Sequence, residues 1–421
     1  MSFRIQVNMP TIPVLHNPAN TQVGANLIQA LNQRNEDRID QILSSPGILQ
    51  ISSADLGTAL MLSFEYFRDS YYDKILTLPA AQNILANGSG GIGHSLAVVC
   101  RIQEPDGFNS IIQHPNFINI NANGPFGLSE AMAAYLKTFM GERKLPDDPN
   151  PEYLKAIINH PNADQINFTQ QLSDLIGESL LYIAAQSEEV FRDEDEEILN
   201  LLLNIKISHL ISPNGQFGLG RIMANAAYST TPSIVTSILA HPAALRINSG
   251  KTVTIKGTDA EEAWSLDNFG FESALFLAVN NGDPKVQNPK NYQNQIVQAL
   301  INFTNMNGIV LSPNTPFGIA DSLTEAASLD DGLTLCILSS NSSVHIQPQA
   351  PNEDSGGLNN ALINAVHNGL LQTVQALLQH PNASQIPLSD LKQGVMIATN
   401  SNQQIAQEIR NYALRIHGVT L

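Results

Sequence analysis

The chain has 421 residues, and the 43% that are hydrophobic are enough to bury a long core. Its formal net charge is −17, with only 21 Lys and Arg residues, which argues against nucleic acid or an anionic membrane as a partner, because both need a basic surface. The composition favours proteins, or a basic or neutral ligand, as partners.

The sequence has no run of 18 apolar residues, so no membrane span is expected. Its amino terminus does not have a basic stretch followed by an apolar stretch, so no secretory signal peptide is expected. Cys100 and Cys336 lie several repeats apart, each inside an apolar helical pattern. We therefore expect two buried thiols in a reducing, intracellular compartment and no disulfide between them.

The amino-terminal residues 1–23 contain Pro10, Pro13 and Pro18 after a short apolar start. Proline at this density disfavours a helix, so the segment is predicted to be an extended lead-in. From residue 24 to residue 416 the chain is predicted to be one repeat array, followed by a short tail at 417–421.

A motif typified by residues 154–167, LKAIINHPNADQIN, recurs nine times. Two adjacent apolar residues and a polar residue precede a position that is often His, which we call the exit position. Proline usually follows it, and an isoleucine lies six residues after it. The exit positions are Ser45, Leu78, His114, His160, Ile205, His241, Phe303, Ser340 and His380. The isoleucines are Ile51, Ile84, Ile120, Ile166, Ile211, Ile247, Ile309, Ile346 and Ile386. Such recurrence indicates a repeat protein whose isoleucines lie in the core.

Each copy reads as two short helices. In residues 357–386 the first has apolar residues at helical spacing, Gly369 ends it, and Pro381 ends the second. Helices of about ten residues are not stable alone, so the pairs must stack. The ten predicted pairs begin near Gly24, Asp55, Gly93, Gly127, Gly177, Gly218, Gly270, Gly318, Gly357 and Leu391.

The copies GESLLYIAAQ with EEILNLLLN, and NNALINAVHNGLLQTVQALLQHPNASQI, resemble ankyrin repeats over about residues 24–416. The resemblance implies an all-α, curved solenoid of about ten ankyrin-like helix-turn-helix repeats, which binds a partner protein on its concave face. The Thr-Pro-Leu-His motif that begins an ankyrin repeat is absent. Segments such as HPNADQIN follow the second helix, where ankyrin repeats have a β-hairpin.

The Asn-rich HPN exits are also similar in style to ankyrin-type effectors of intracellular bacteria. That likeness implies a virulence role in host-pathogen interaction. The protein would be secreted by a bacterial secretion system into the host cytosol, where it would bind a host protein.

Insertions interrupt the array at 141–152, 249–270 and 282–294. The second contains KTVTIK, which alternates at period two and predicts a strand, and the chain's one tryptophan, Trp264. Insertions in repeat proteins often carry binding, so Trp264 is a candidate partner contact; the alternative is that it packs onto its own repeat.

Phe126, Phe217 and Phe317 share the context PFGL, QFGL or PFGI at the start of a pair. They are predicted to anchor turns, or alternatively to form a contact surface at the loop tips. Asp193 and Asp195 belong to the run DEDEE at the start of a second helix, where acidic side chains complement the helix dipole. The alternative for this run is a docking site for a basic partner.

No catalytic, cofactor-binding or metal-binding residue is predicted. Residues 88–93, GSGGIG, match a dinucleotide motif, but a helix exit and not a strand precedes them. The histidines before proline occupy one equivalent position in each repeat, so they cannot converge on a zinc ion; we expect their imidazoles to bond the last helix carbonyls. The prediction is a protein-protein interaction scaffold. The alternatives are a hydrolase or transferase with a site in the concave cleft, or a scaffold within a homo-oligomer, and the oligomeric state stays open.

Overall fold

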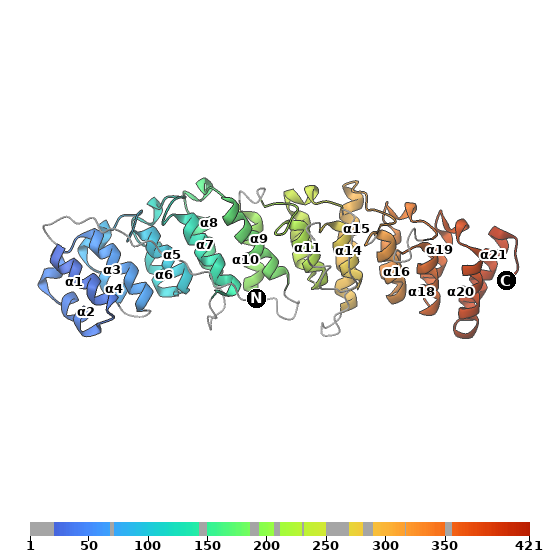
Figure 1. Ribbon diagram of the computed structural model, residues 1–421, viewed down its shortest axis with the longest axis horizontal. Coiled ribbons are helices and arrows are strands. Elements are labelled where there is room, and N and C mark those ends of the chain that lie inside the picture. Colours follow the sequence, from blue (N-terminus) through green and yellow to red (C-terminus); the bar gives the residue numbers. More distant parts are fainter. Residues whose placement is uncertain are drawn as a thin grey trace. The chain divides into compact units, whose positions relative to one another are not determined.

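The computed structural model describes residues 21–67, 71–142, 150–185, 193–205, 211–229, 231–249, 269–280, 289–315, 317–349 and 356–421. These residues are helical, with no strand among them, and they form ten successive pairs of helices, as the sequence predicts (Figure 1). The predicted strand KTVTIK lies outside the described residues, as do the lead-in up to residue 20 and most of the 249–270 insertion.

The chain divides into two compact units, residues 1–175 and 176–421, where the sequence predicts one array. The helices of unit 1 are α1 Thr21–Asn32, α2 Glu36–Leu43, α3 Ser53–Tyr66, α4 Tyr71–Leu76, α5 Ile92–Ile102, α6 Pro105–Ile112, α7 Leu128–Lys137 and α8 Pro151–Ile158. A π-helical turn, η4 Thr138–Glu142, extends α7. Helix α9, Gln170–Ala184, contains the boundary between the units.

Unit 2 continues with the remaining helix pairs. Its helices are α10 Asp193–Asn204, α11 Leu219–Tyr228, α12 Pro232–Ala240, α14 Phe271–Asn280, α15 Pro289–Met306, α16 Ile319–Leu329, α17 Asp331–Leu338, α18 Leu358–His367, α19 Leu371–Gln379, α20 Leu388–Ser401 and α21 Gln403–His417. The part of the 282–294 insertion that is described, from residue 289, is helical and lengthens α15.

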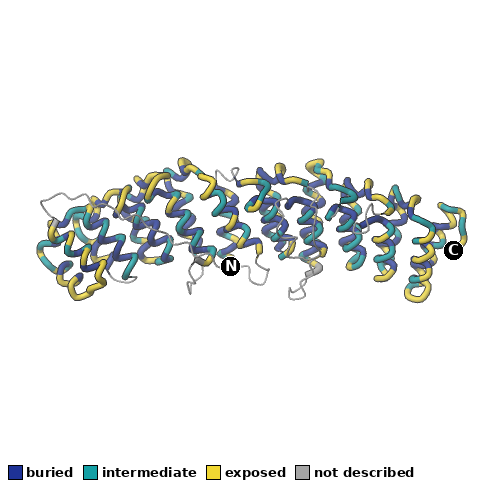
Figure 2. Tube along the Cα trace, viewed as in Figure 1, coloured by how far each residue is buried: buried dark blue, intermediate teal, exposed yellow. Residues whose placement is uncertain are grey.

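The core lies between stacked pairs. In unit 1 the first helices α1, α3, α5 and α7 pack on one another in series. In unit 2 the first helices α11, α14, α16, α18 and α20 do the same, and the second helices α10, α12, α15, α17, α19 and α21 form a parallel series. Figure 2 shows the buried positions on the sides of helices that face a neighbour, which is where the apolar residues recur at helical spacing.

A 3₁₀ turn, and not only the extended return that the sequence predicts, follows most second helices. Proline after the exit position holds that residue extended, as at Leu78 and His241, and then occupies the first position of the turn. These exit turns are η1 Pro46–Gln50, η2 Pro79–Asn83, η3 Phe117–Asn119, η5 Ala163–Gln165, η7 Pro242–Arg246, η8 Ser343–His345 and η9 Ala383–Gln385.

Glycines near the predicted helix starts have two different roles. Gly127 and Gly318 are N-caps, directly before α7 and α16. Gly93 is the second residue of α5, so the predicted start near it is confirmed, whereas Gly177 lies well inside α9, so the prediction of a start there is wrong. A Cβ on Gly93 would lie 2.0 Å from the carbonyl oxygen of Phe126, so this glycine is required by the close approach of the next loop.

The recurring isoleucines are buried, as predicted, with one exception. Ile51, Ile84, Ile120, Ile166, Ile211, Ile247, Ile346 and Ile386 are core residues. Ile309 is only half-buried, because α15 continues past the predicted exit at Phe303 to Met306. The buried Leu311, two residues later, takes the core position in this pair.

Candidate functional site

Three of the four exit-position histidines, His114, His160 and His380, join one helix pair to the preceding pair. Nε2 of His114 lies 2.9 Å from the carbonyl oxygen of Ala81, and Nε2 of His160 lies 2.8 Å from that of Phe117. Nδ1 of each ring accepts a hydrogen bond from the backbone N–H two residues on, at 3.1 and 3.0 Å. The neutral tautomer with hydrogen on Nε2 satisfies both contacts.

His380 repeats this geometry in unit 2, with Nε2 2.9 Å from the carbonyl oxygen of Ser343. The expectation that the imidazoles bond the last helix carbonyls is therefore wrong: the acceptor lies in the exit turn of the preceding pair. Each ring is used for packing one pair on another, so these histidines are structural and not a catalytic or metal site.

Asparagines form a second set of bonds between pairs, which the sequence analysis does not predict. Asn87 donates from Nδ2 to the carbonyl of Asn119 at 3.1 Å, and its Oδ1 accepts from the N–H of Asn121 at 2.6 Å. The amide carries a donor and an acceptor side by side, so it pairs with a backbone as another peptide group would. The same paired bonds recur at Asn123, Asn214 and Asn314. We call these four residues the ladder asparagines.

The predicted phenylalanines lie in loops that follow the ladder asparagines, and each is half-buried. The ring of Phe126 stacks on His94 at a centroid distance of 3.9 Å, and Phe317 makes an edge contact with Phe276 at 4.8 Å. Phe217 lies against Gly177, where an added Cβ would come within 2.7 Å of the Phe217 side chain. These contacts agree with turn anchoring, and part of each ring remains accessible.

Backbone strain marks two of these loops. Phe126 and Phe317 are left-handed, with φ of 64° and 61°, which is unfavourable for a side chain of this size. A carboxylate four residues on accepts the N–H of each: Glu130 for Phe126 and Asp321 for Phe317, both at 2.6 Å. In the loop before α5, which is equivalent to the Phe126 and Phe317 loops, the N–H of Gly90 donates to Nδ1 of His94 at 3.2 Å.

Only one of the two aspartates of the DEDEE run is at the surface. The run begins α10, as predicted, so its charges lie at the positive end of the helix dipole. Asp193 is exposed, whereas the side chain of Asp195 is fully buried and is not accessible to a partner. Trp264 lies outside the described residues.

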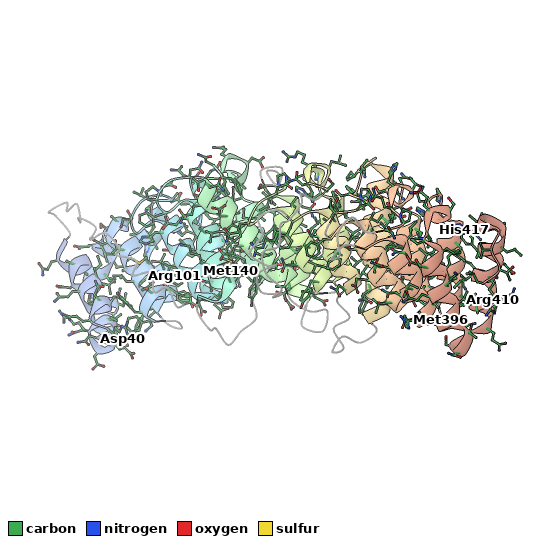
Figure 3. The ribbon with its side chains drawn as sticks, turned by 45° about the vertical axis from the view of Figure 1, so that its right-hand side comes forward. Asp40, Arg101, Met140, Met396, Arg410 and His417 are labelled. Atoms are coloured by element: carbon green, nitrogen blue, oxygen red, sulfur yellow. The ribbon has the colours of Figure 1, made fainter. Side chains whose placement is uncertain are left out.

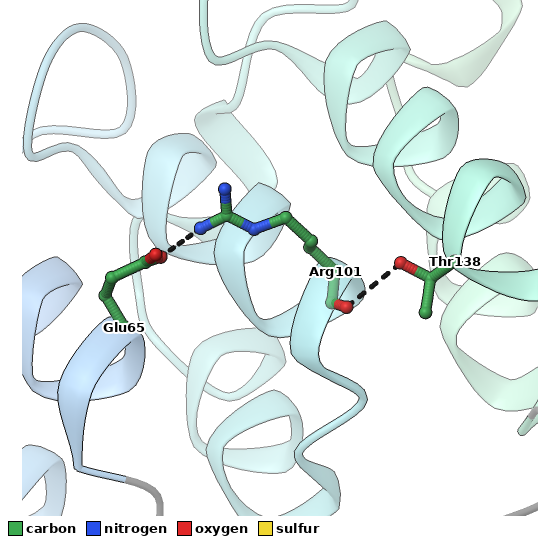
Figure 4. Close-up of polar contacts among 3 residues, drawn as sticks. All are labelled: Glu65, Arg101 and Thr138. Atoms are coloured by element: carbon green, nitrogen blue, oxygen red, sulfur yellow. Dashed lines mark hydrogen bonds and ion pairs between the residues drawn. The ribbon is translucent and has the colours of Figure 1, made fainter. Parts of the chain in front are cut away.

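In unit 1 a polar line crosses the first helices at their carboxyl-terminal ends (Figure 4). Arg101 of α5 pairs with Glu65 of α3, and the hydroxyl of Thr138 in η4 donates to the Arg101 carbonyl at 3.0 Å. Arg101 and Glu65 are each about a quarter exposed, 29% and 25% by side chain, so the pair is partly available to a partner.

In unit 2 carboxyl groups occupy the corresponding helices. Asp321 and Glu325, one turn apart on α16, are half-buried. Burial raises the pKa of both groups, and the charge of Asp321 raises the pKa of Glu325 further. On α14, burial also raises the pKa of Glu272, whose carboxylate accepts the N–H of Ser312 at 2.5 Å. A cation placed beside Glu325 would relieve the repulsion from Asp321.

One position on the first helices changes chemistry from pair to pair. It is the third residue after the glycine that precedes or begins the helix, and we call it the variable position. Each of its occupants is half-buried or exposed. The occupants are His94 and Glu130 in unit 1, and Arg221, Ser273, Asp321 and Asn360 in unit 2. A constant frame therefore carries six different side chains at one structural place.

The described residues hold no group of three His, Cys, Asp or Glu side chains that could bind a metal ion. A surface depression of about 340 Å³ lies between α6 and α8; Phe108 and Ile112 contribute apolar surface to it, and Glu152 and Lys155 pair at its rim.

The two cysteines do not form a disulfide bond. Cys100 is buried, and burial raises the pKa of its thiol. Cys336 is half-buried, and burial raises the pKa of its thiol to about 11.

None of the helices in the described part of the chain combines the length and the apolar character needed to cross a bilayer. Comparison with protein-family models, with curated proteins and with solved structures finds no match.

Proposed function

We propose that the protein is a protein-protein interaction scaffold: a solenoid of ankyrin-like repeats that presents the exposed sides of its first helices to a partner. The observation that carries this proposal is the variable position. Histidine, asparagine, glycine and isoleucine residues recur where they hold the pairs together, while the variable position, half-buried in four pairs and exposed in two, holds a different chemical group in each of the six. A repeated frame with varied exposed side chains is suited to recognition by shape and charge.

The partner surface best matched to unit 2 is basic. Asp321 accepts the backbone N–H of Phe317, whose side chain is half-buried, and Glu325 lies one turn from Asp321 on α16. A lysine or arginine side chain placed there would gain charge attraction and could lie on the aromatic ring. The net charge of −17 would speed the encounter with such a partner.

By its resemblance to ankyrin-type bacterial effectors, the proposed setting is the host cytosol, after delivery by a bacterial secretion system, with a host protein as the partner. The insertion at 249–270, with Trp264, belongs to this proposal as a second recognition element, and so does Asp193 on α10.

The test is affinity capture from a host lysate followed by mass spectrometry, with quantitative binding of the captured protein. Glu325→Lys reverses a charge on the first helix α16. It is expected to weaken binding of the partner at least about tenfold, because losing and reversing one charge contact costs about 1.4 kcal/mol or more of binding free energy. Glu36→Lys is the matched control, because Glu36 is exposed on the second helix α2, outside the surfaces proposed for recognition.

Binding should also fall as salt rises, because the attraction is electrostatic. Deletion of residues 250–269 tests the insertion separately. Unchanged capture by both Glu325→Lys and the deletion would contradict the proposal that these surfaces recognise the partner.

A further inference from the structure

The exposed large apolar side chains of unit 1 lie in or just after its first three exit turns. Among the described residues of this unit, three large apolar side chains are exposed: Leu49 by 66%, Leu85 by 66% and Ile118 by 58%. Leu49 and Ile118 each lie four residues after an exit position, in η1 and η3, and Leu85 follows η2. Single exposed leucines are ordinary, but Leu49 and Ile118 occupy the same place in the first and third exit turns, and exposed apolar side chains that recur along a stack are suited to an interaction site.

The fourth exit turn of unit 1, η5, contains the exposed Asp164, but the first three exit turns carry no charge. Residues 45–54, 75–93 and 107–129, which contain these exit turns and the loops after them, include no Asp, Glu, Lys or Arg, in a chain whose net charge is −17. We call these three segments the exit edge of unit 1. A charged partner gains no ion pair there, and a molecule with the same net charge meets its least repulsion there.

Most exposed polar side chains of the exit edge are amides. Gln50, Gln82, Asn83 and Asn119 are exposed, and each amide can both donate and accept a hydrogen bond. An amide can therefore pair with a copy of itself, whereas a carboxylate or an ammonium group repels its own copy. Apolar and amide side chains together make a surface that is chemically complementary to itself.

The backbone of this edge is held in place by bonds between successive turns. His114 and Asn116 bond to the carbonyls of Ala81 and Ile84 at 2.9 and 2.8 Å, and Asn87 bonds to Asn119. A surface already ordered before binding loses little conformational entropy when a partner docks.

From these observations we infer that the exit edge of unit 1 binds the same edge of a second copy of the chain. A two-fold interface uses one patch on both partners, so self-complementary chemistry is what it requires. The two copies meet where neither carries charge. The surface differs from the first-helix surface of the proposed function, so the two can succeed or fail independently.

Sedimentation velocity over a range of concentrations tests this inference. A species of twice the 45.6 kDa chain mass is expected, and its share should grow as salt rises from about 0.05 M to about 0.5 M, because salt screens the repulsion between two acidic molecules. Binding of a basic partner to the first helices has the opposite salt dependence.

The variant Leu85→Glu with Ile118→Glu places charges in the exit edge and should raise the dimer dissociation constant about tenfold or more, since burying unpaired charges is costly. Both side chains are exposed in one copy, so its fold should persist; an unchanged far-ultraviolet circular dichroism spectrum and melting temperature check this.

Met396→Glu is the control, because Met396 is 73% exposed, its side chain projects from α20 into solvent (Figure 3), and it does not belong to the exit edge. A chain that stays monomeric at all concentrations and salt levels would overturn the inference. An equal loss of association in the Met396→Glu control would also overturn the inference, because the added negative charge, and not its position in the exit edge, would then explain the weaker association.

Discussion

His94 shows how one residue combines a structural bond with sensitivity to acid. Its Nδ1 accepts the N–H of Gly90 and its ring stacks on Phe126. Burial, with a smaller effect from the positive charge of Arg101, lowers its pKa to about 4. A histidine with a lowered pKa stabilises the fold fully above its unfolded value, near 6.5, and this stabilisation is lost as pH falls from there toward about 4.

The substitution His94→Asn should reduce this acid sensitivity, because Oδ1 of asparagine can accept the same bond and does not titrate. Between about pH 7.5 and about pH 4.5, the variant should lose less unfolding free energy than the wild type, by about 1–2 kcal/mol after allowance for the partial exposure of the ring. Urea unfolding at both pH values measures this. His345→Asn changes an exposed histidine and serves as the control; equal acid losses in the wild type and His94→Asn would refute the assignment.

At this scale the sequence predicts which residues are structural better than it predicts what they bond. Recurrence of the exit histidines indicates a structural role, but their acceptors lie 33 to 43 residues earlier in the chain, in the preceding pair. Periodicity does not reveal such a partner. The ladder asparagines also recur, three of the four directly before a loop glycine, and that recurrence is the signal that could have identified them.

Helix pairs are the scale at which sequence prediction succeeds most. Apolar spacing with glycine and proline punctuation predicts the ten pairs, because each short helix must bury one face. Errors arise where a residue serves packing in place of helix ending. Gly177 allows the Phe217 loop to approach α9 and does not begin that helix, and in α15 the apolar pattern around Phe303 continues the helix instead of closing it.

The corrected register of α15 can be tested by a pair of substitutions. Leu311→Ala removes a fully packed side chain and should lower the unfolding free energy by about 2–5 kcal/mol. Ile309→Ala changes a half-buried residue and should cost about 1 kcal/mol or less. Thermal and chemical denaturation compare the two variants; a larger loss for Ile309→Ala would restore the register expected from the motif.

For the whole molecule, composition and pattern predict an all-helical chain, and the structure confirms it in the described residues. They do not predict the division into two compact units, because the boundary falls within α9 and no linker composition marks it. The insertions can be recognised in the sequence because the repeat motif is interrupted there. Which residues they contact depends on the tertiary structure, which the repeat motif does not determine.

Helix α21 ends the series of second helices and packs on α19 and α20. Its buried face includes Ile405, Ile409 and Tyr412. Deletion of residues 403–421 should expose the apolar surfaces beneath it, lower the melting temperature by several degrees and increase the binding of a hydrophobic dye. Deletion of residues 418–421 alone is the control. An unchanged melting temperature after the longer deletion would show that α21 does not protect the end of unit 2.

The ladder asparagines have a consequence for how such a chain can change in length. Each makes its two bonds to backbone groups, which every residue type provides, so the joint between neighbours depends little on which side chains the next pair carries. If a helix pair between two ladder asparagines were duplicated or lost, each ladder asparagine would still find a backbone carbonyl and a backbone N–H in the neighbouring pair. The chain could therefore gain or lose whole pairs, and vary their exposed residues, while its remaining joints stay intact.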